Sequence, residues 1–226
     1  MQTFINIFTA PTKAFESLNE KPTWLVPLIV MIVVIVGFQY LTLDITKEYQ
    51  LAVMEARDMP QAQLDAVKQQ MNGPFKYIGM VGVIIFIPIA WLVIAGILLG
   101  ASKITIPDGI TFKKSLSIVA WSSLIGIIST ALMLFLILSK GTIHGVVLDL
   151  SAILTTPPIG EPTPVINRLL SKIDPFTIWQ LALWAIGLKV MGKTTINKAI
   201  VPVAVLWIVW VILSVSLGGF FEKLGM

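Results

Sequence analysis

The 226-residue sequence contains no cysteine and only one histidine, His144. Without cysteine the chain can form neither a disulfide framework nor a thiolate metal site, and it has no cysteine nucleophile. A lone histidine in a connecting segment, with no HExxH spacing, is more typical of a surface residue than of a metal ligand. We therefore expect no metal site and no cofactor.

Charged residues are also scarce, at 12% of the chain against about 25% in a typical soluble domain. Hydrophobic residues make up 56% and gather in five long apolar runs. This pattern predicts an all-α, polytopic membrane protein: a bundle of five transmembrane helices with helical extramembrane loops. The predicted spans are residues 24–43, 77–99, 115–138, 175–191 and 199–217.

The fourth run is the shortest, and its start has the chemistry of a helix N-terminus. Asp174 can cap free backbone N–H groups, and Pro175 fits the first helical turn. The uncharged part ends at Leu188, so the helix completes a crossing only if Lys189 extends its ammonium to the headgroups. Lys189 and Gln180 could line a polar path, but a Lys at the interface and a Gln bonded inside the bundle is the favoured interpretation.

Residues 1–21 are predicted to form a cytoplasmic, amphipathic N-terminal segment ahead of a membrane domain at 22–226. They lack the basic start of a cleaved signal peptide. Phe4, Phe8 and Phe15 fall at helical spacing. Two interpretations stay open: the rings enter the headgroup boundary, or they pack under the bundle. Thr9 is predicted to cap the second short helix, which begins near Pro11.

The two long connections have different compositions. Residues 44–76 show helical periodicity with mixed charges, which predicts a solvated helical hairpin whose second helix begins at Pro60. Residues 139–173 are interrupted by four prolines and end in a short amphipathic helix at 165–173.

Basic residues predict the orientation. Eight lie in the N-terminal segment, the 101–114 loop and the last turn, and eight lie in the two long loops and the C-terminal tail. The first set occupies about half as many residues, and the positive-inside rule weights short loops and span ends. We therefore expect the N-terminus inside and the C-terminus outside. Because the lysines flank the spans, the net charge of +4 does not indicate nucleic acid binding.

No aspartate or glutamate lies inside any predicted span. Proton-coupled carriers and intramembrane aspartyl proteases need such a carboxylate. Ser122 and Ser123 have no GxSxG context and no His or Lys at depth to activate them. The sequence therefore indicates that the protein is not an enzyme and has no catalytic residue.

Small and polar residues within the spans are the candidates for helix packing or interaction. Gly96 and Gly100 stand four apart, which permits close helix approach, and serines in lipid seek a carbonyl or another helix. The full candidate set is Gly96, Gly100, Ser122, Ser123, Asp174, Trp179, Gln180, Gly187 and Lys189.

From Asp174 onward, DPFTIWQLALWAIGLKVMGKTTINKA resembles the signature of the YIP1 family in bacteria, and the N-terminal IFTAPTKAFESLNEKPTWLVPLIV is similar to that family's opening. The resemblance implies five spans with a cytoplasmic N-terminus, here in the bacterial cytoplasmic (inner) membrane. Eukaryotic relatives take part in vesicle trafficking and bind small GTPases through longer N-terminal regions. Some bacterial relatives accompany ABC-type exporters. The family offers no catalytic residues.

Two functions follow as hypotheses. The first is a non-enzymatic scaffold or accessory subunit, for example of an ABC-type exporter, with the lipid bilayer and other membrane proteins or a second copy as partners. The alternative is a lipid-translocating or small-solute transport protein, for which Pro88, Gly37 and the span-3 serines could build a polar groove.

Overall fold

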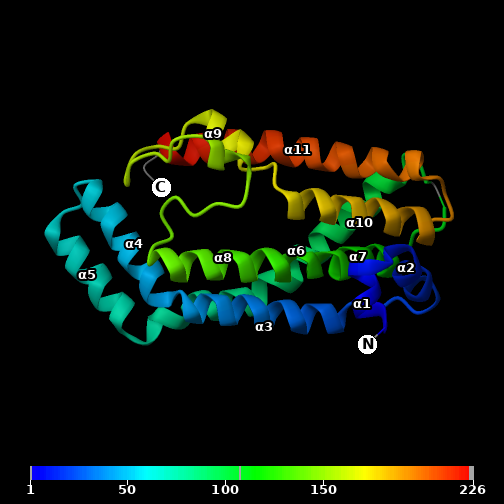
Figure 1. Cartoon of the computed structure of the whole chain (residues 1–226), viewed down its shortest axis with the longest axis horizontal. Helices are drawn as coiled ribbons and strands as arrows, with labels where there is room; N and C mark the ends of the chain where they lie inside the picture. Colours follow the sequence, from blue (N-terminus) through cyan, green and yellow to red (C-terminus); the bar gives the residue numbers. More distant parts are fainter. Residues whose placement is uncertain (1, 107, 224–226) are drawn as a thin grey trace.

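The computed structural model describes residues 2–106 and 108–223. These residues form helices and loops, and none of them lies in a strand (Figure 1). The α-helices are α1 (Gln2–Thr9), α2 (Pro11–Glu20), α3 (Leu25–Leu41), α4 (Leu43–Ala56), α5 (Gln61–Asn72), α6 (Ile78–Ser102), α7 (Phe112–Ser122), α8 (Gly126–Lys140), α9 (Val165–Leu170), α10 (Pro175–Met191) and α11 (Ile196–Lys223). Three short 3₁₀ helices lie between these α-helices in the described residues: η1 (Pro74–Tyr77), η2 (Ser123–Ile125) and η3 (Leu150–Ile153).

The long helices lie side by side along one axis (Figure 1). Helix α6 packs against α7, α3 and α11, and α10 packs against α11, α7 and α2. Helices α1 and α2 lie at one end of the bundle, together with the 103–111 loop and the α10–α11 turn. Helices α4 and α5 lie at the other end.

Three helical stretches are long and apolar enough to cross a membrane: α6, α7 through α8 (Phe112–Lys140), and α11 over Ile196–Gly218. A fourth crossing exists if α3 and α4, bent by 62° between them, form one span. Helix α10 has 17 residues, or roughly 26 Å at about 1.5 Å per residue, against about 30 Å of hydrocarbon. The membrane-protein fold is confirmed at this level, and the count of five spans is not.

Hydroxyl side chains lie at the junction of α3 and α4, which is the end of predicted span 1, and at the 3₁₀ turn inside predicted span 3. Buried Thr42, between α3 and α4, donates a hydrogen bond to the Phe38 carbonyl at 2.9 Å. Ser123, where α7 gives way to η2, donates to the Val119 carbonyl at 2.8 Å. A hydroxyl that bonds back to the preceding turn competes with the helix ladder and favours bending. Span 3 is therefore less regular than the sequence predicted, whereas α3 ends within two residues of the predicted end of span 1.

The N-terminal segment packs into the bundle. Ile7 and Phe15 are fully buried, and α2 lies against α10. Of the two interpretations left open, this favours packing under the bundle. The predicted cap at Thr9 is wrong. The N-cap of α2 is Ala10, without a side-chain bond, and the Thr9 hydroxyl donates instead to the Ile5 carbonyl at 3.1 Å.

The helices predicted in the two long connections are present. Residues 44–76 contain the hairpin of α4 and α5, with Pro60 as the N-cap of α5 and an exposed Lys68–Glu55 ion pair at 3.2 Å between the helices. Helix α9 ends at Leu170, earlier than predicted.

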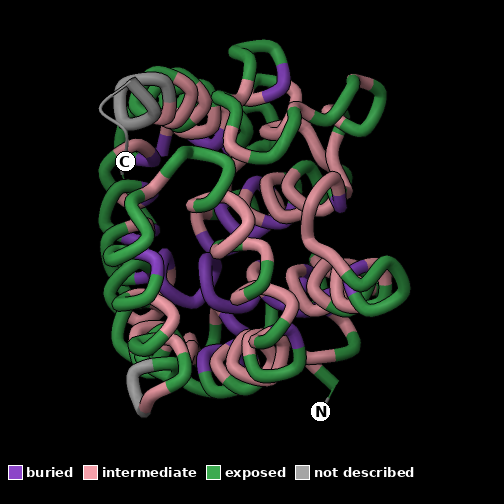
Figure 2. Tube along the Cα trace, turned by 90° about the vertical axis from the view of Figure 1, so that its left-hand side faces the viewer, coloured by how far each residue is buried: buried purple, intermediate pink, exposed green. Residues whose placement is uncertain are grey.

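Buried residues gather on the inward faces of the helices, and exposed residues cover the outside (Figure 2). Much of that outer surface is apolar, as at Phe86 (69% exposed) on α6 and Trp210 (62%) on α11. An apolar surface of this extent suits lipid as the surrounding solvent.

Candidate functional site

The N-terminus of α10 has the predicted cap. The Oδ1 atom of Asp174 accepts hydrogen bonds from the backbone N–H groups of Phe176 and Thr177, both at 2.9 Å. Asp174 has an extended backbone and Pro175 occupies the first helical position. Caps of this kind stabilise a helix by about 1 kcal/mol. The local sequence therefore fixes where α10 begins.

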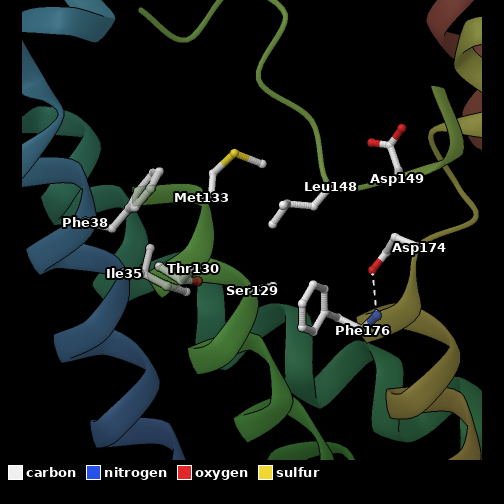
Figure 3. A pocket seen from close by; sticks show the side chains of 9 residues that line it. All are labelled: Ile35, Phe38, Ser129, Thr130, Met133, Leu148, Asp149, Asp174 and Phe176. Atoms are coloured by element: carbon white, nitrogen blue, oxygen red, sulfur yellow. Dashed lines mark hydrogen bonds between the residues drawn. The ribbon is translucent and has the colours of Figure 1, made fainter. Parts of the chain in front are cut away.

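Asp174 also lies on a cavity of about 410 Å³ between α3, α8, the start of α10 and the loop that follows α8 (Figure 3). Its lining divides into an apolar set and a polar set. The apolar residues are Ile35, Phe38, Met133, Leu148 and Phe176, and the polar residues are Ser129, Thr130, Asp149 and Asp174. None of these residues is basic.

The second carboxylate, Asp149, is held by its own loop. Its Oδ1 atom accepts hydrogen bonds from the backbone N–H of Ser151 at 2.9 Å and from the Ser151 hydroxyl. The next N–H along, that of Leu150, donates to the Ile173 carbonyl at 3.0 Å, beside Asp174. This contact brings the loop to the start of α10.

Sequence reasoning missed Asp149, Ser129 and Thr130 as members of a site. The Asp-x-Ser spacing at 149–151 is a local capping signal that could have marked Asp149. Nothing in the local sequence places it near Asp174, because the Leu150–Ile173 contact joins positions 23 residues apart.

Gln180 is bonded inside the bundle, which is the interpretation that the sequence favoured. Its Nε2 atom donates to the Ser123 hydroxyl at 3.3 Å. The neighbouring Ser122 is fully buried, and its hydroxyl has no hydrogen-bond partner among the described residues. Lys189 lies exposed in the last turn of α10, at the end where the chain turns into α11.

Gly187 lies at a close contact between α10 and its neighbours. A Cβ atom there would lie 2.8 and 2.9 Å from the two γ carbons of Ile118 and 3.2 Å from the Phe15 ring. Trp179, about two turns earlier on α10, meets the Phe8 ring edge-on with centroids 6.5 Å apart. Both candidates therefore hold α10 against other helices of this chain.

Gly96 and Gly100 lie on the exposed side of α6. A Cβ atom at Gly100 would meet nothing within 4 Å, and one at Gly96 would meet only the ring edge of Phe112 at 3.9 Å. The packed face of α6 instead carries Trp91 and Ala95. Within the described part of the chain, no helix uses the two glycines for close approach.

A polar clamp at the opposite end of the bundle was not foreseen. The Lys114 ammonium donates to the Gly109 carbonyl at 2.9 Å and to the Met191 carbonyl at 3.1 Å. The Thr105 hydroxyl donates to the Lys198 carbonyl at 2.8 Å. Together these bonds join the 103–111 loop to the end of α10 and the start of α11.

His144 stacks on the Tyr49 ring, with centroids 5.9 Å apart and planes at 29°. Across residues 2–106 and 108–223, no three histidine, aspartate or glutamate side chains gather closely enough to hold a metal ion.

The apolar helices and their exposed apolar surfaces define an α-helical, multi-pass integral membrane protein. The chain belongs to the Yip1 family: the family model of the Yip1 domain matches residues 5–218, nearly the whole sequence. This confirms the resemblance seen at both ends of the chain. No curated protein and no solved structure matches the chain.

Proposed function

We propose that this Yip1-family protein is a non-enzymatic scaffold or an accessory subunit of a membrane complex, such as one with an ABC-type exporter. The single observation that carries the proposal is the pair Gly96 and Gly100. Both are exposed on a helix that is long enough to cross the membrane, and neither is used for close packing within the described chain.

In lipid, helices associate through close backbone contact rather than through the hydrophobic effect, because lipid tails are as apolar as leucine. Glycines four residues apart on an outward face permit that contact. Around them, Leu92, Val93 and Ile97 are about half exposed and apolar. A partner's membrane helix, or a second copy of this chain, can replace lipid there without desolvating a polar group.

The proposal includes five crossings, with α3 and α10 spanning as well, and a cytoplasmic N-terminus in the bacterial inner membrane. Helix α10 packs along α11 over much of its length, and its last turn lies beside the 103–111 loop. Its 17 residues fall short of a typical span by about 4 Å, a difference that lysine snorkelling and local thinning of the bilayer can accommodate.

Affinity purification in a mild detergent tests the scaffold. The wild-type chain is expected to retain a defined membrane-protein partner or a second copy. Gly96→Leu and Gly100→Leu are expected to reduce the retained amount about tenfold, a loss of about 1.4 kcal/mol. Gly79→Leu is the matched control, since Gly79 is an exposed glycine at the other end of α6 with nothing within 4 Å. Equal retention by all three variants, or a wild-type monomer with no partner, contradicts the proposal.

The cavity beside Asp174 favours a second candidate function, translocation of a lipid or transport of a small solute. It combines an apolar wall with hydroxyls at Ser129 and Thr130, on helices that the sequence predicts to lie in the membrane. Flux into proteoliposomes is the direct test. We expect Thr130→Leu to abolish a flux that the wild type supports. Wild-type flux no greater than that of protein-free liposomes contradicts this candidate.

A further inference from the structure

We infer that the cavity between α3, α8 and α10 binds an organic cation with an apolar body: a free lipophilic cation that carries no phosphate. The inference names a ligand class for the cavity on which the second candidate function rests. It does not depend on the scaffold role.

The cavity has the size and the walls for an apolar body. Pockets that hold drug-sized molecules measure about 300–1,000 Å³, and this one measures about 410 Å³. Phe38, Met133, Leu148 and Phe176 line it from four segments of the chain: α3, α8, the loop after α8, and α10 (Figure 3). The rings of Phe38 and Phe176 also offer π faces, which attract a cation.

The mixed lining of the cavity suits an amphipathic ligand. Ser129 lies 11 residues before the end of α8 at Lys140, so it lies roughly 16 Å along the helix at about 1.5 Å per residue. Asp149 and Asp174 instead lie in the segments that follow α8 and precede α10. Carboxylates and hydroxyls therefore line the same cavity as the apolar side chains.

The charge of the lining selects the sign of the ligand. Two carboxylates line the cavity and no lysine, arginine or histidine does. In each carboxylate the structure assigns the hydrogen bonds to Oδ1, in both cases from groups at the start of a helix. The Oδ2 atoms accept none of these bonds. A cation removed from water needs such a counter-charge, whereas an anion or a phosphate would be repelled.

Equilibrium dialysis of the detergent-purified full chain with tetraphenylphosphonium tests this inference. We expect saturable binding above that of protein-free micelles. Tetraphenylborate is the matched control ligand, because it has the same four-phenyl shape and the opposite charge. It is expected to show no saturable binding.

Substitutions distinguish a loss of binding caused by the missing negative charge from one caused by a disturbed fold. Asparagine caps a helix about as well as aspartate, so Asp149→Asn and Asp174→Asn together remove the negative charge and keep the hydrogen bonds. We expect this double variant to bind tetraphenylphosphonium at least about tenfold more weakly, with unchanged thermal unfolding. Asp108→Asn, at the opposite end of the bundle, is the matched control and should bind as the wild type does. Met133→Trp should weaken binding by filling the cavity.

Several outcomes would overturn the inference. These are the absence of saturable tetraphenylphosphonium binding, equal binding of tetraphenylborate, and equal weakening by Asp108→Asn. Saturable binding of phosphatidylethanolamine with none of tetraphenylphosphonium would show a lipid site instead, and would also overturn it. Specific binding without flux in proteoliposomes supports the cation site and contradicts the transport candidate, so the two failures are distinguishable.

Discussion

At the residue scale, Gly187 sets how closely α10 lies to its neighbours. A β carbon at this position would approach both γ carbons of Ile118 to less than 3.0 Å. Ile118 is fully buried and branched at Cβ, so its γ carbons cannot move without turning the whole side chain. The Phe15 ring, also fully buried, closes the site from α2. The packing around position 187 therefore requires glycine, whose side chain is a single hydrogen atom.

We expect Gly187→Ala to lower the free energy of unfolding by about 1–3 kcal/mol, the usual cost of adding a methyl group to a packed core. Thermal unfolding in detergent, followed by circular dichroism, measures the change. Gly37→Ala is the matched control: it lies inside α3, a Cβ there meets nothing within 4 Å, and the change should leave stability equal or raise it by about 0.5–1 kcal/mol. Equal melting temperatures for Gly187→Ala and wild type would contradict this account of the contact.

At the element scale, the C-terminus of α10 depends on a lysine from another helix. The last carbonyls of a helix lack partners within it, and a cation there also complements the helix dipole. Lys114, on α7, donates to the Met191 carbonyl of α10 and to the Gly109 carbonyl of the preceding loop. One ammonium thus connects three segments.

Lys114→Met keeps most of the aliphatic stem and removes the ammonium. Because Lys114 is partly exposed and water can replace some of its bonds, we expect a loss of only about 1 kcal/mol. The melting temperature in detergent should fall, whereas Lys113→Met, at an exposed neighbouring position, should melt as the wild type does. If the two variants melt alike, the clamp does not stabilise the end of α10.

The sequence predicts elements well where a local signal defines them. The cap at Asp174 and the helices on either side of Pro60 are examples, because each depends on residues only a few positions apart. The 3₁₀ turn at Ser123 was not predicted, since a hydroxyl in an apolar run also occurs in straight helices. Local periodicity likewise did not show that α11 begins at Ile196, which places Pro202 inside the helix rather than near its start.

The candidate site was only partly predictable for a related reason. The role of Asp174 as a helix cap can be predicted from the residues next to it. The cavity, however, is also lined by α3, α8 and the 148–149 loop. Their meeting depends on contacts between distant positions. Gly96 and Gly100 show the converse: their spacing predicted close approach, and the chain leaves that face uncovered.

At the scale of the whole molecule, the two ends of the bundle differ in charge. The segments at the α1–α2 end hold eight basic and three acidic residues, and those at the α4–α5 end hold eight basic and nine acidic residues. Raw lysine and arginine counts are equal, so acidic residues produce the difference in net charge. The basic residues at the α1–α2 end also lie in short segments next to helix ends, which is where the positive-inside rule applies.

This asymmetry predicts that the α1–α2 end faces the cytoplasm. The chain has no native cysteine, so a single introduced cysteine reports on one position alone. In intact cells, a membrane-impermeant maleimide is expected to label Glu161→Cys, in the loop at the α4–α5 end. It is expected to label Asp108→Cys only after permeabilisation. Thr194→Cys tests α10, because the α10–α11 turn shares a side with Asp108 only if α10 crosses the bilayer. Labelling of Asp108→Cys in intact cells would reverse the orientation, and labelling of Thr194→Cys together with Glu161→Cys would remove α10 from the set of spans.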